Sequence, residues 1–242
     1  RPLDYESSAL TSWAMGPPKL GCTKLLNLFN YVQLCGMKNI KAIILDLGGV
    51  ILNINYQKTI NEFENIGIKR ASSLYSKQTQ NNLFDQIETG AISENEFLNG
   101  IQNLAGKTTH NEIRKAWNSM ILNLPDSRIK SIQKVKAKCK IFLLSNTNSI
   151  HISEFKRKIG DLKYHKFYNL FEKIYYSYEI GHRKPDKDAF QIILNENNLI
   201  ANEVFFIDDS YQHIKTAKSL SINTHHLKDN EDLTSILADI TQ

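Results

Sequence analysis

The sequence is poor in cysteine, with three in 242 residues. Cys22, Cys35 and Cys139 are too few and too irregularly spaced for a disulfide framework or a zinc site. No stretch approaches the roughly 18 consecutive apolar residues that a transmembrane helix needs. These absences exclude a disulfide-rich domain and a membrane span, and we expect a soluble protein of the reducing cytoplasm.

The sequence also lacks the clustered basic residues of a nucleic-acid-binding protein. The formal net charge is +5 and the isoelectric point is about 8.9. However, the lysines are scattered, and no basic run is interleaved with aromatic residues. We interpret the excess charge as a solvated surface that weakly attracts anionic substrates, and we expect no nucleic acid and no membrane as partners.

Residues 1–36 show no pattern that leads into a strand. They include Pro17-Pro18, and the stretch 25–34 is interrupted by polar residues, which excludes the apolar core of a signal peptide. We expect an N-terminal extension that is non-native or weakly ordered, with translation beginning at Met37. An amphipathic helix at 24–34 that docks on the domain is the alternative.

From Met37 onward, short apolar runs alternate with amphipathic segments. Five runs have the length and content of buried strands: 42–45, 141–144, 174–176, 204–207 and 223–227. Helical patterns lie between them, at 127–137, 186–196 and 211–220. This alternation predicts an α/β fold of the Rossmann-like, doubly wound kind, with a parallel sheet covered on both faces.

The alternation stops between the first two strands. Residues 54–124 show helix after helix, with the S/T-x-x-E spacing of capping boxes at Ser93–Glu96 and Thr109–Glu112. Helical patterns also end at Gly67 and Gly90, as helices often do. We therefore predict a helical cap at 54–124, inserted into a core formed by 37–53 and 125–242, where it can cover the ligand-binding ends of the strands.

Polar residues follow the apolar strands at the point where each strand ends. Asp46 follows the first strand, Ser145-Asn146 ends the second, Lys184 comes after the third, and Asp208-Asp209 ends the fourth. Taken singly, each has a structural interpretation as a turn residue, a helix cap or a solvated surface charge. In a parallel sheet, however, all four strand ends lie along one edge, so these side chains are expected to meet.

The chemistry that suits this set is phosphoryl transfer. Three close carboxylates (Asp46, Asp208 and Asp209) repel one another, which implies a hard cation such as Mg²⁺. The cation and Lys184 would neutralise a phosphate, leaving Asp46 able to attack phosphorus and form an aspartyl-phosphate. Ser145, Asn146 and the amides of the Gly48-Gly49 turn can hydrogen-bond the phosphoryl oxygens. We therefore predict a hydrolase that acts on a small phosphorylated metabolite.

The motifs DLGGVIL, LSNTN followed by His151, GHRKP and FIDDS resemble those of the haloacid dehalogenase-like hydrolase superfamily. They are most similar to its helical-cap sugar phosphatases of the alpha-D-glucose-1-phosphate phosphatase type, as is the segment FDQIETGAISENEF. The resemblance covers residues 37–230. It implies that Asp46 is the nucleophile, that Ser145 and Lys184 bind phosphate, and that Asp209 is a direct metal ligand with Asp208 beside it. It further implies that the Gly48 carbonyl is a metal ligand.

One position departs from most phosphatases of the superfamily. These carry a second Asp two residues after the nucleophile as general acid and base, and here that position is Gly48. Such help is worth about 10²–10⁴-fold. Three explanations stay open: a substrate with a good leaving group, a proton supplied by His151 or His182, or a protein that binds a phosphorylated ligand as a regulator without turnover.

Two related activities are disfavoured by the residues. A phosphomutase needs the acid that Gly48 lacks, and a dehalogenase needs no metal and hence no Asp208-Asp209 pair. A response-regulator receiver has the same residue types in a different chain order and no helical insertion. Candidate substrate-facing residues are Asn53, Asn55, Tyr56 and Trp117. The sequence is compatible with a monomer or a homodimer.

Overall fold

The computed structural model describes residues 39–75 and 82–241. The expectations for residues 1–36 therefore lie outside the described part. The strands of the sheet are β1 (Ala42–Leu45), β2 (Lys140–Ser145), β3 (Lys173–Tyr176), β4 (Val204–Asp208) and β5 (Asn223–His226). All four neighbouring pairs are parallel, and the strand order is β3-β2-β1-β4-β5. The predicted α/β fold and all five predicted strands are confirmed.

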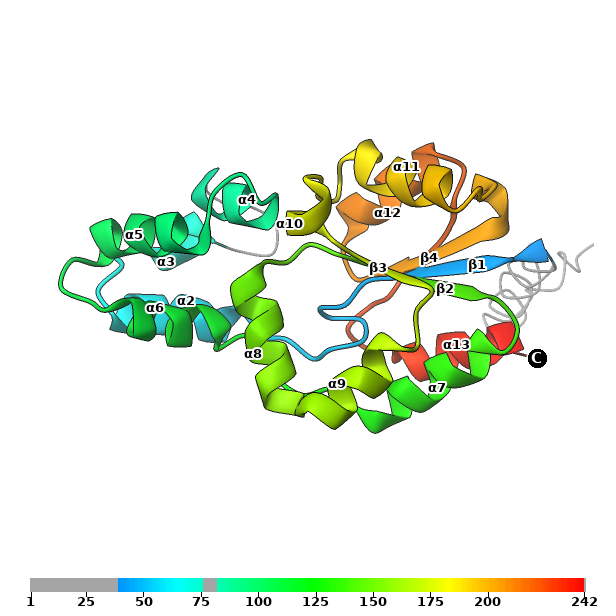
Figure 1. The fold of residues 1–242 in the computed structure, drawn as a ribbon, viewed down its shortest axis with the longest axis horizontal. Helices are drawn as coiled ribbons and strands as arrows, with labels where there is room; N and C mark the ends of the chain where they lie inside the picture. The colour runs from blue at the N-terminus through cyan, green and yellow to red at the C-terminus, as the bar shows by residue number, and fades with distance from the viewer. Residues whose placement is uncertain (1–38, 76–81, 242) are drawn as a thin grey trace, which may run out of the picture. The chain divides into compact units, whose positions relative to one another are not determined.

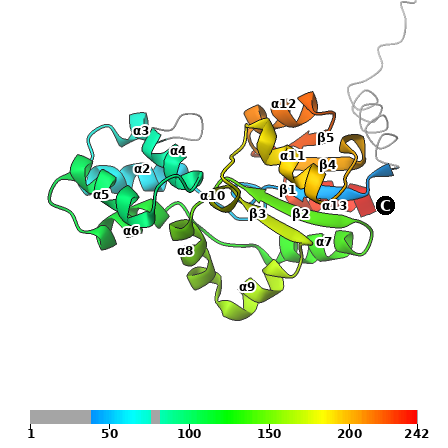
Figure 2. The same ribbon diagram turned by 45° about the horizontal axis from the view of Figure 1, so that its top comes forward.

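The central strand, β1, reads AIIL, and all four of its side chains are fully buried. Such continuous apolar runs are typical of parallel strands that are covered on both faces. Helices α11 and α12 lie on one face of the sheet, and α7, α9 and α13 lie on the other (Figures 1 and 2). The edge strand β5 (NTHH) is only partly buried.

One helix of this layer architecture precedes β2, and the others follow β2, β3, β4 or β5. They are α7 (Asp126–Lys136), α8 (Ser149–Ile159), α9 (Asp161–Tyr168), α10 (Ser177–Ile180), α11 (Lys187–Glu196), the 3₁₀ helix η2 (Ala201–Glu203), α12 (Tyr211–Ser219) and α13 (Leu233–Thr241). The sequence analysis found α7, α11 and α12 but missed α8, α9 and α13. One hydrophobic cluster, which includes Ile44, Phe190 and Ile214, joins the sheet to α11 and α12.

Between β1 and α7 the described chain is helical. The elements are α2 (Tyr56–Asn65), α3 (Ala71–Leu74), α4 (Asn82–Glu88), α5 (Glu94–Ala105) and α6 (His110–Asn118). Both predicted capping boxes are present, at the starts of α5 and α6. Five rings pack against one another in this α2–α6 segment: Phe63, Tyr75, Phe84, Phe97 and Trp117. The segment thus has an aromatic core of its own.

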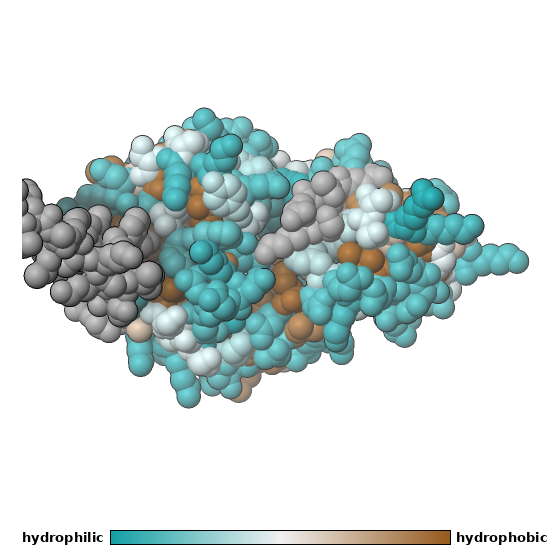
Figure 3. Space-filling model, turned by 180° about the vertical axis from the view of Figure 1, so that it is seen from behind, coloured by the Kyte–Doolittle hydropathy of each residue, from teal (hydrophilic) through white to brown (hydrophobic). Residues whose placement is uncertain are grey.

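The carboxyl ends of the strands face the α2–α6 segment (Figure 1). Arg183, in the loop after α10, forms ion pairs with Asp85 and Glu88 of α4. Lys158 of α8 and Lys163 of α9 donate hydrogen bonds to the carbonyls of Ile121 and Leu124, which follow α6. The face seen from behind is mostly hydrophilic, with hydrophobic side chains in small groups (Figure 3).

Candidate active site

The three acidic residues predicted at the strand ends come together in space. Asp46 directly follows β1, Asp208 is the last residue of β4, and Asp209 follows it. Each offers a carboxylate oxygen, and these oxygens lie within 4.8 Å of one another. They meet because β1 and β4 are neighbouring parallel strands, with Leu45 opposite Ile207.

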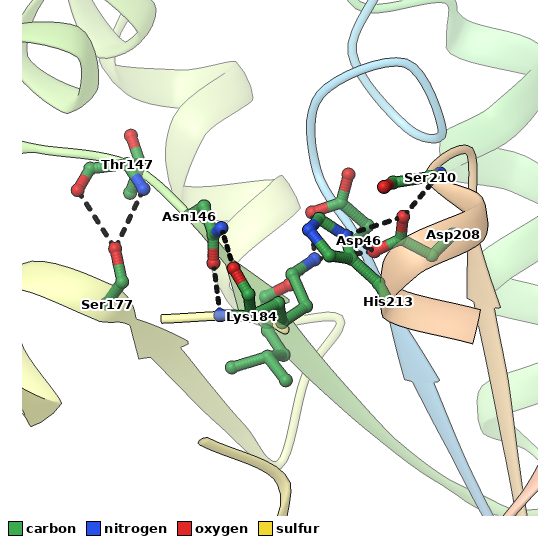
Figure 4. Close-up of polar contacts among 9 residues, drawn as sticks. Asp46, Asn146, Thr147, Ser177, Lys184, Asp208, Ser210 and His213 are labelled. Carbon is green, nitrogen blue, oxygen red and sulfur yellow. Dashed lines mark hydrogen bonds and ion pairs between the residues drawn. The ribbon is translucent and has the colours of Figure 1, made fainter. Parts of the chain in front are cut away.

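Lys184 is fully buried and pairs with two of these three carboxylates. Its Nζ atom lies 2.6 Å from Asp46 Oδ1, 2.7 Å from Asp208 Oδ2 and 2.9 Å from the carbonyl oxygen of Leu144 (Figure 4). All three ammonium donors are therefore used. The interpretation of Lys184 as a solvated surface residue is wrong, because the loop after α10 turns this side chain inward.

Asp46 and Asp208, two carboxyl groups of the cluster, have very different pKa values. Burial raises the pKa of Asp46 to about 7, with Lys184 opposing and Asp208 and Asp209 reinforcing the shift. Burial would also raise the pKa of Asp208, but Lys184 and His213 outweigh it and hold that pKa at about 2. Burial acts against the charged form of Lys184, yet the two carboxylates keep its pKa above the ordinary value. Asp208 and Lys184 thus form a permanent charge pair, whereas Asp46 responds to its surroundings.

Asp208 is fixed by more contacts than the sequence indicated. Its Oδ1 atom accepts a hydrogen bond from the Ser210 backbone N–H at 2.7 Å and lies 2.9 Å from His213 Nδ1. His213 belongs to the first turn of α12, and the sequence analysis missed it. The only signal was its position in the helix that follows the acidic pair, which is weak because a histidine there is ordinary.

The predicted phosphate-binding residues have unequal surroundings. Ser145 is buried at the end of β2 and lines the cavity at Asp46. Asn146 lines it too, but its amide binds the backbone of Lys184, donating to the carbonyl at 2.7 Å and accepting from the N–H at 2.8 Å. Asn146 therefore holds the Lys184 loop against the end of β2, a role that the sequence did not indicate.

The glycines of the turn after β1 leave room for the acidic cluster. Gly49 has φ +80°, and a Cβ atom there would lie 2.2 Å from Asp209 Oδ2. At Gly48 a Cβ atom would lie 3.0 Å from Ile54 Cδ1. Gly49 therefore permits both the turn and the close approach of Asp209, whereas the constraint at Gly48 is packing.

The site opens into a cavity of about 100 Å³, room for several water-sized groups. The core contributes Asp46 and Asp209 to its lining, the α2–α6 segment contributes Tyr56 and Glu88, and Met120 follows just after α6. His151 and Arg183 also line it. The cavity thus joins the acidic cluster to the helical segment.

Of the four residues predicted to face a substrate, Tyr56 alone lines this cavity. Asn53 accepts a hydrogen bond from Arg128, and Asn55 caps α2. Trp117 is fully buried in the aromatic core. Of the two candidate proton donors, His151 lines the cavity, whereas His182 is not among its lining residues and has a side chain that is 41% exposed.

The donor set fits a hard divalent cation. It consists of carboxylate oxygens within bridging distance, which Mg²⁺ and Ca²⁺ prefer and which zinc sites rarely use alone. Asp46 and Asp209 face the cavity, whereas both oxygens of Asp208 already bind Lys184, Ser210 and His213. A cation at this site would therefore be held by Asp46 and Asp209, with Asp208 behind them.

The chain belongs to the haloacid dehalogenase-like hydrolase family, whose model matches residues 40–220. Among curated proteins it is similar to D-ribitol-5-phosphate phosphatase of Bacteroides thetaiotaomicron, with 29% identity over 199 residues, 80% of this chain and 94% of the relative. A sesquiterpene phosphatase of Aspergillus oryzae is 23% identical over 193 residues, 78% of this chain and 91% of the relative.

Solved structures agree with the family assignment. A family enzyme of Bacteroides thetaiotaomicron, solved as a variant with magnesium and inorganic phosphate, superposes with a TM-score of 0.77. The identity is 32%, over 81% of this chain and 98% of that one. A predicted family hydrolase of Porphyromonas gingivalis superposes with a TM-score of 0.72 at 24% identity, over 84% and 98% of the two chains. The resemblance recognised in the sequence is therefore confirmed.

Proposed function

We propose that this protein is a magnesium-dependent phosphatase that hydrolyses small phosphate monoesters of sugars or polyols. The observation that carries the proposal is the buried Asp46–Lys184–Asp208 arrangement at the mouth of a cavity that also contains Asp209. The family assignment and the phosphatase names of the relatives support it. The similarity to a D-ribitol-5-phosphate phosphatase points to polyhydroxylated substrates.

The reaction assigns a separate task to each group. An oxygen of Asp46 attacks phosphorus, the ester P–O bond breaks, and the phosphoryl group passes to Asp46. A water molecule then attacks the aspartyl-phosphate, which releases inorganic phosphate and restores the Asp46 carboxylate. Lys184 holds Asp46 in place and offsets negative charge, and Ser145 donates to a phosphoryl oxygen. Asp46, Asp209 and the carbonyl of Gly48, with Asp208 beside them, would hold Mg²⁺, which when bound would supply further positive charge.

The leaving group must take up a proton, and Gly48 has no side chain to supply one. We therefore expect the rate to depend strongly on the leaving group, with anomeric and aryl phosphates hydrolysed faster than primary alkyl phosphates. Positioned acid catalysis, where present, is worth about 10²–10⁴-fold, which sets the scale of this dependence.

We also propose that the α2–α6 segment is a cap that covers the strand ends, with limits near 54–124 and a core formed by 37–53 and 125–242. Its separate aromatic core and the Arg183 ion pairs to α4 support this division. Among residues 39–75 and 82–241, every helix is too short or too polar to cross a bilayer. The cytoplasmic location and the monomer or homodimer state stay predictions from the sequence.

The test is phosphate release from a panel of hexose 1-phosphates, hexose 6-phosphates, pentitol phosphates, nucleotides and an aryl phosphate, with Mg²⁺ or with EDTA. We expect Mg²⁺-dependent release that falls at least about 10³-fold in Asp46→Asn, because the nucleophile is lost. A folded protein that binds Mg²⁺ and phosphate but releases none from any ester would instead be a ligand-binding regulator, the alternative that Gly48 leaves open.

A further inference from the structure

Tyr56 is the first residue of α2, and its side chain lines the cavity that contains Asp46. Its ring packs on the buried ring of Tyr75, with the centroids 5.7 Å apart. Burial raises the pKa of Tyr56 well above its usual range. The nearby carboxylates of Asp209, Glu88 and Asp46 raise that pKa further. The hydroxyl therefore keeps its proton and lies near the acidic cluster.

The Tyr56 hydroxyl is available to a ligand. No group among residues 39–75 and 82–241 forms a hydrogen bond with it. Unlike the hydroxyl of Tyr176, it is not one of the polar atoms that are sealed in the interior without a partner. The oxygen therefore borders open space. The three carboxylates that act on it, those of Asp46, Glu88 and Asp209, all line the cavity, so this space is the cavity itself.

The in-line geometry of phosphoryl transfer determines where the leaving oxygen lies. The attacking and leaving oxygens are roughly opposite each other across phosphorus. Asp46 follows β1, and the carboxyl ends of the strands face the α2–α6 segment (Figure 1). The hydroxyl groups of Ser145, Thr147 and Ser210 also follow or end strands and so lie on the same side as Asp46. The leaving oxygen of a substrate attacked by Asp46 therefore points toward the α2–α6 segment.

Three polar side chains of the α2–α6 segment line the cavity, those of Tyr56, Tyr75 and Glu88. The Tyr75 hydroxyl donates to the Met120 sulfur at 3.5 Å. Glu88 forms an ion pair with Arg183, and its carboxylate only accepts hydrogen bonds. Of these three side chains, Tyr56 is the one that can donate a hydrogen bond to a substrate.

Two further residues of the lining, His151 and Arg183, are poor donors for a leaving group. The His151 Nδ1 atom must donate to the amide oxygen of Asn118, 2.9 Å away, because that oxygen only accepts. Burial lowers the pKa of His151 to about 3, so the ring is neutral and Nε2 has no proton. The terminal nitrogens of Arg183 form ion pairs with Asp85 and Glu88. The expectation that His151 supplies a proton is therefore disfavoured.

We propose that Tyr56 is a catalytic residue whose O–H donates a hydrogen bond to the leaving oxygen of the substrate. The inference rests on the proposed phosphatase function and supplies part of the help that Gly48 cannot give. When the ester P–O bond breaks, its electron pair stays on the leaving oxygen, and the hydrogen bond stabilises the negative charge that develops there. The alkoxide then takes its proton from a water molecule, and Tyr56 keeps its own.

The experiment measures kcat/KM for ethyl, difluoroethyl and trifluoroethyl phosphate in the wild type, in Tyr56→Phe and in the control Tyr175→Phe. Fluorine makes the leaving alcohol more acidic and changes its size little. Tyr56→Phe removes the hydroxyl and keeps a ring on Tyr75. Tyr175 is a matched control because its hydroxyl also binds polar groups, those of Glu196 and Asn197, outside the cavity.

We expect kcat/KM of Tyr56→Phe to fall about 10-fold with ethyl phosphate, the equivalent of about 1.4 kcal/mol. With trifluoroethyl phosphate the loss should be at most about 3-fold, because a better leaving group carries less charge that needs a donor. Tyr175→Phe should keep the wild-type ratios between the three esters. A loss in Tyr56→Phe that is equal for all three esters, or no loss at all, would overturn the proposal.

A second measurement needs no turnover. In fluorotyrosine-labelled Asp46→Asn protein, the ¹⁹F resonance of Tyr56 is assigned by its absence when Tyr56→Phe is added. This resonance should shift when ethyl phosphate and Mg²⁺ bind, and calorimetry measures the binding. A bound ester that leaves the resonance in place would refute the inference. If the wild type releases phosphate from no ester, the proposed function fails, but this experiment still decides whether Tyr56 contacts the bound ester.

Discussion

At the scale of single residues, Lys184 has no donor left for a substrate. Its Nζ atom contacts Asp46, Asp208 and the Leu144 carbonyl, and the Asn146 amide holds its backbone. Lys184 therefore attracts a bound phosphate by the charge of its ammonium group and does not donate a hydrogen bond to it. Because a buried charge without a partner is costly, the Asp208 carboxylate and the Lys184 ammonium each depend on the other.

Gly49 supports the first prediction at this scale. The substitution Gly49→Ala places a Cβ atom where Asp209 Oδ2 lies and puts an L-residue at φ +80°. We expect the backbone strain to cost about 1–2 kcal/mol of stability, and the displaced carboxylate to lower Mg²⁺ affinity and kcat/KM at least about 10-fold. Magnesium titration calorimetry and steady-state kinetics measure the two effects.

Gly106→Ala is the matched control for this prediction. Gly106 has φ +75°, and a Cβ atom there would have nothing within 4 Å. It should therefore lose comparable stability and keep Mg²⁺ affinity and activity. Equal kinetic losses in both variants would show that strain alone, and not the approach of Asp209, explains the effect.

At the scale of elements, the strands were predictable because parallel strands are apolar along their whole length. The sequences of β1 (AIIL) and β4 (VFFID) are so apolar that their side chains must lie in the interior. Helices α8, α9 and α13 were not found, although Asn148, a good capping residue, directly precedes α8. Its apolar positions are few, and α8 packs partly on α6 across a separation in sequence that periodicity cannot reveal.

The candidate site was predictable where residues end strands and unpredictable where loops bring them in. Asp46 and Asp208 follow from the strand pattern alone. Their contact with Lys184 depends on how the loop after α10 turns, and the contact of Asp208 with His213 depends on the start of α12. Asn118 and His151 meet only because α6 packs on α8. No local pattern contains that information.

The link between α4 and the loop after α10 carries the second prediction. Arg183 pairs with Asp85 and with Glu88, whose side chain is 5% exposed. We expect Arg183→Gln to cost on the order of 3 kcal/mol, because the buried Glu88 carboxylate loses its counter-charge. The control Arg114→Gln removes a half-exposed pair with Glu94 and should cost at most about 1 kcal/mol. Urea unfolding of both variants measures the two losses of stability. Similar losses would show that the burial of Glu88 does not matter.

At the scale of the whole molecule, the carboxylates of the acidic cluster repel one another, and the rest of the fold must offset this repulsion. Three carboxylates, those of Asp46, Asp208 and Asp209, lie close together, and one buried ammonium pairs with the first two. The protein can relieve the excess negative charge by protonating Asp46 or by binding a cation. Its stability should therefore depend on pH and on Mg²⁺ together.

The third prediction concerns the sign of that dependence. The pKa of Asp46 is raised in the folded state to about 7, from 3.8. Between these values the folded protein holds a proton that the unfolded chain has lost, so this contribution to stability is complete below about pH 4 and is lost as the pH rises to about 7. His151, with its pKa lowered to about 3, acts in the opposite direction.

The comparison of wild type with Asp46→Asn isolates Asp46, because both proteins carry His151. In EDTA, we expect the free energy of unfolding of the wild type, relative to Asp46→Asn, to fall between about pH 4 and pH 7. With Mg²⁺ the trend should reverse, because the cation favours the ionised carboxylate and adds binding free energy to the folded state. Chemical unfolding at several pH values measures both trends. A difference that is flat with pH in EDTA would mean that Asp46 ionises at an ordinary pH, and Lys184 would then be strong enough to cancel the burial of the nucleophile.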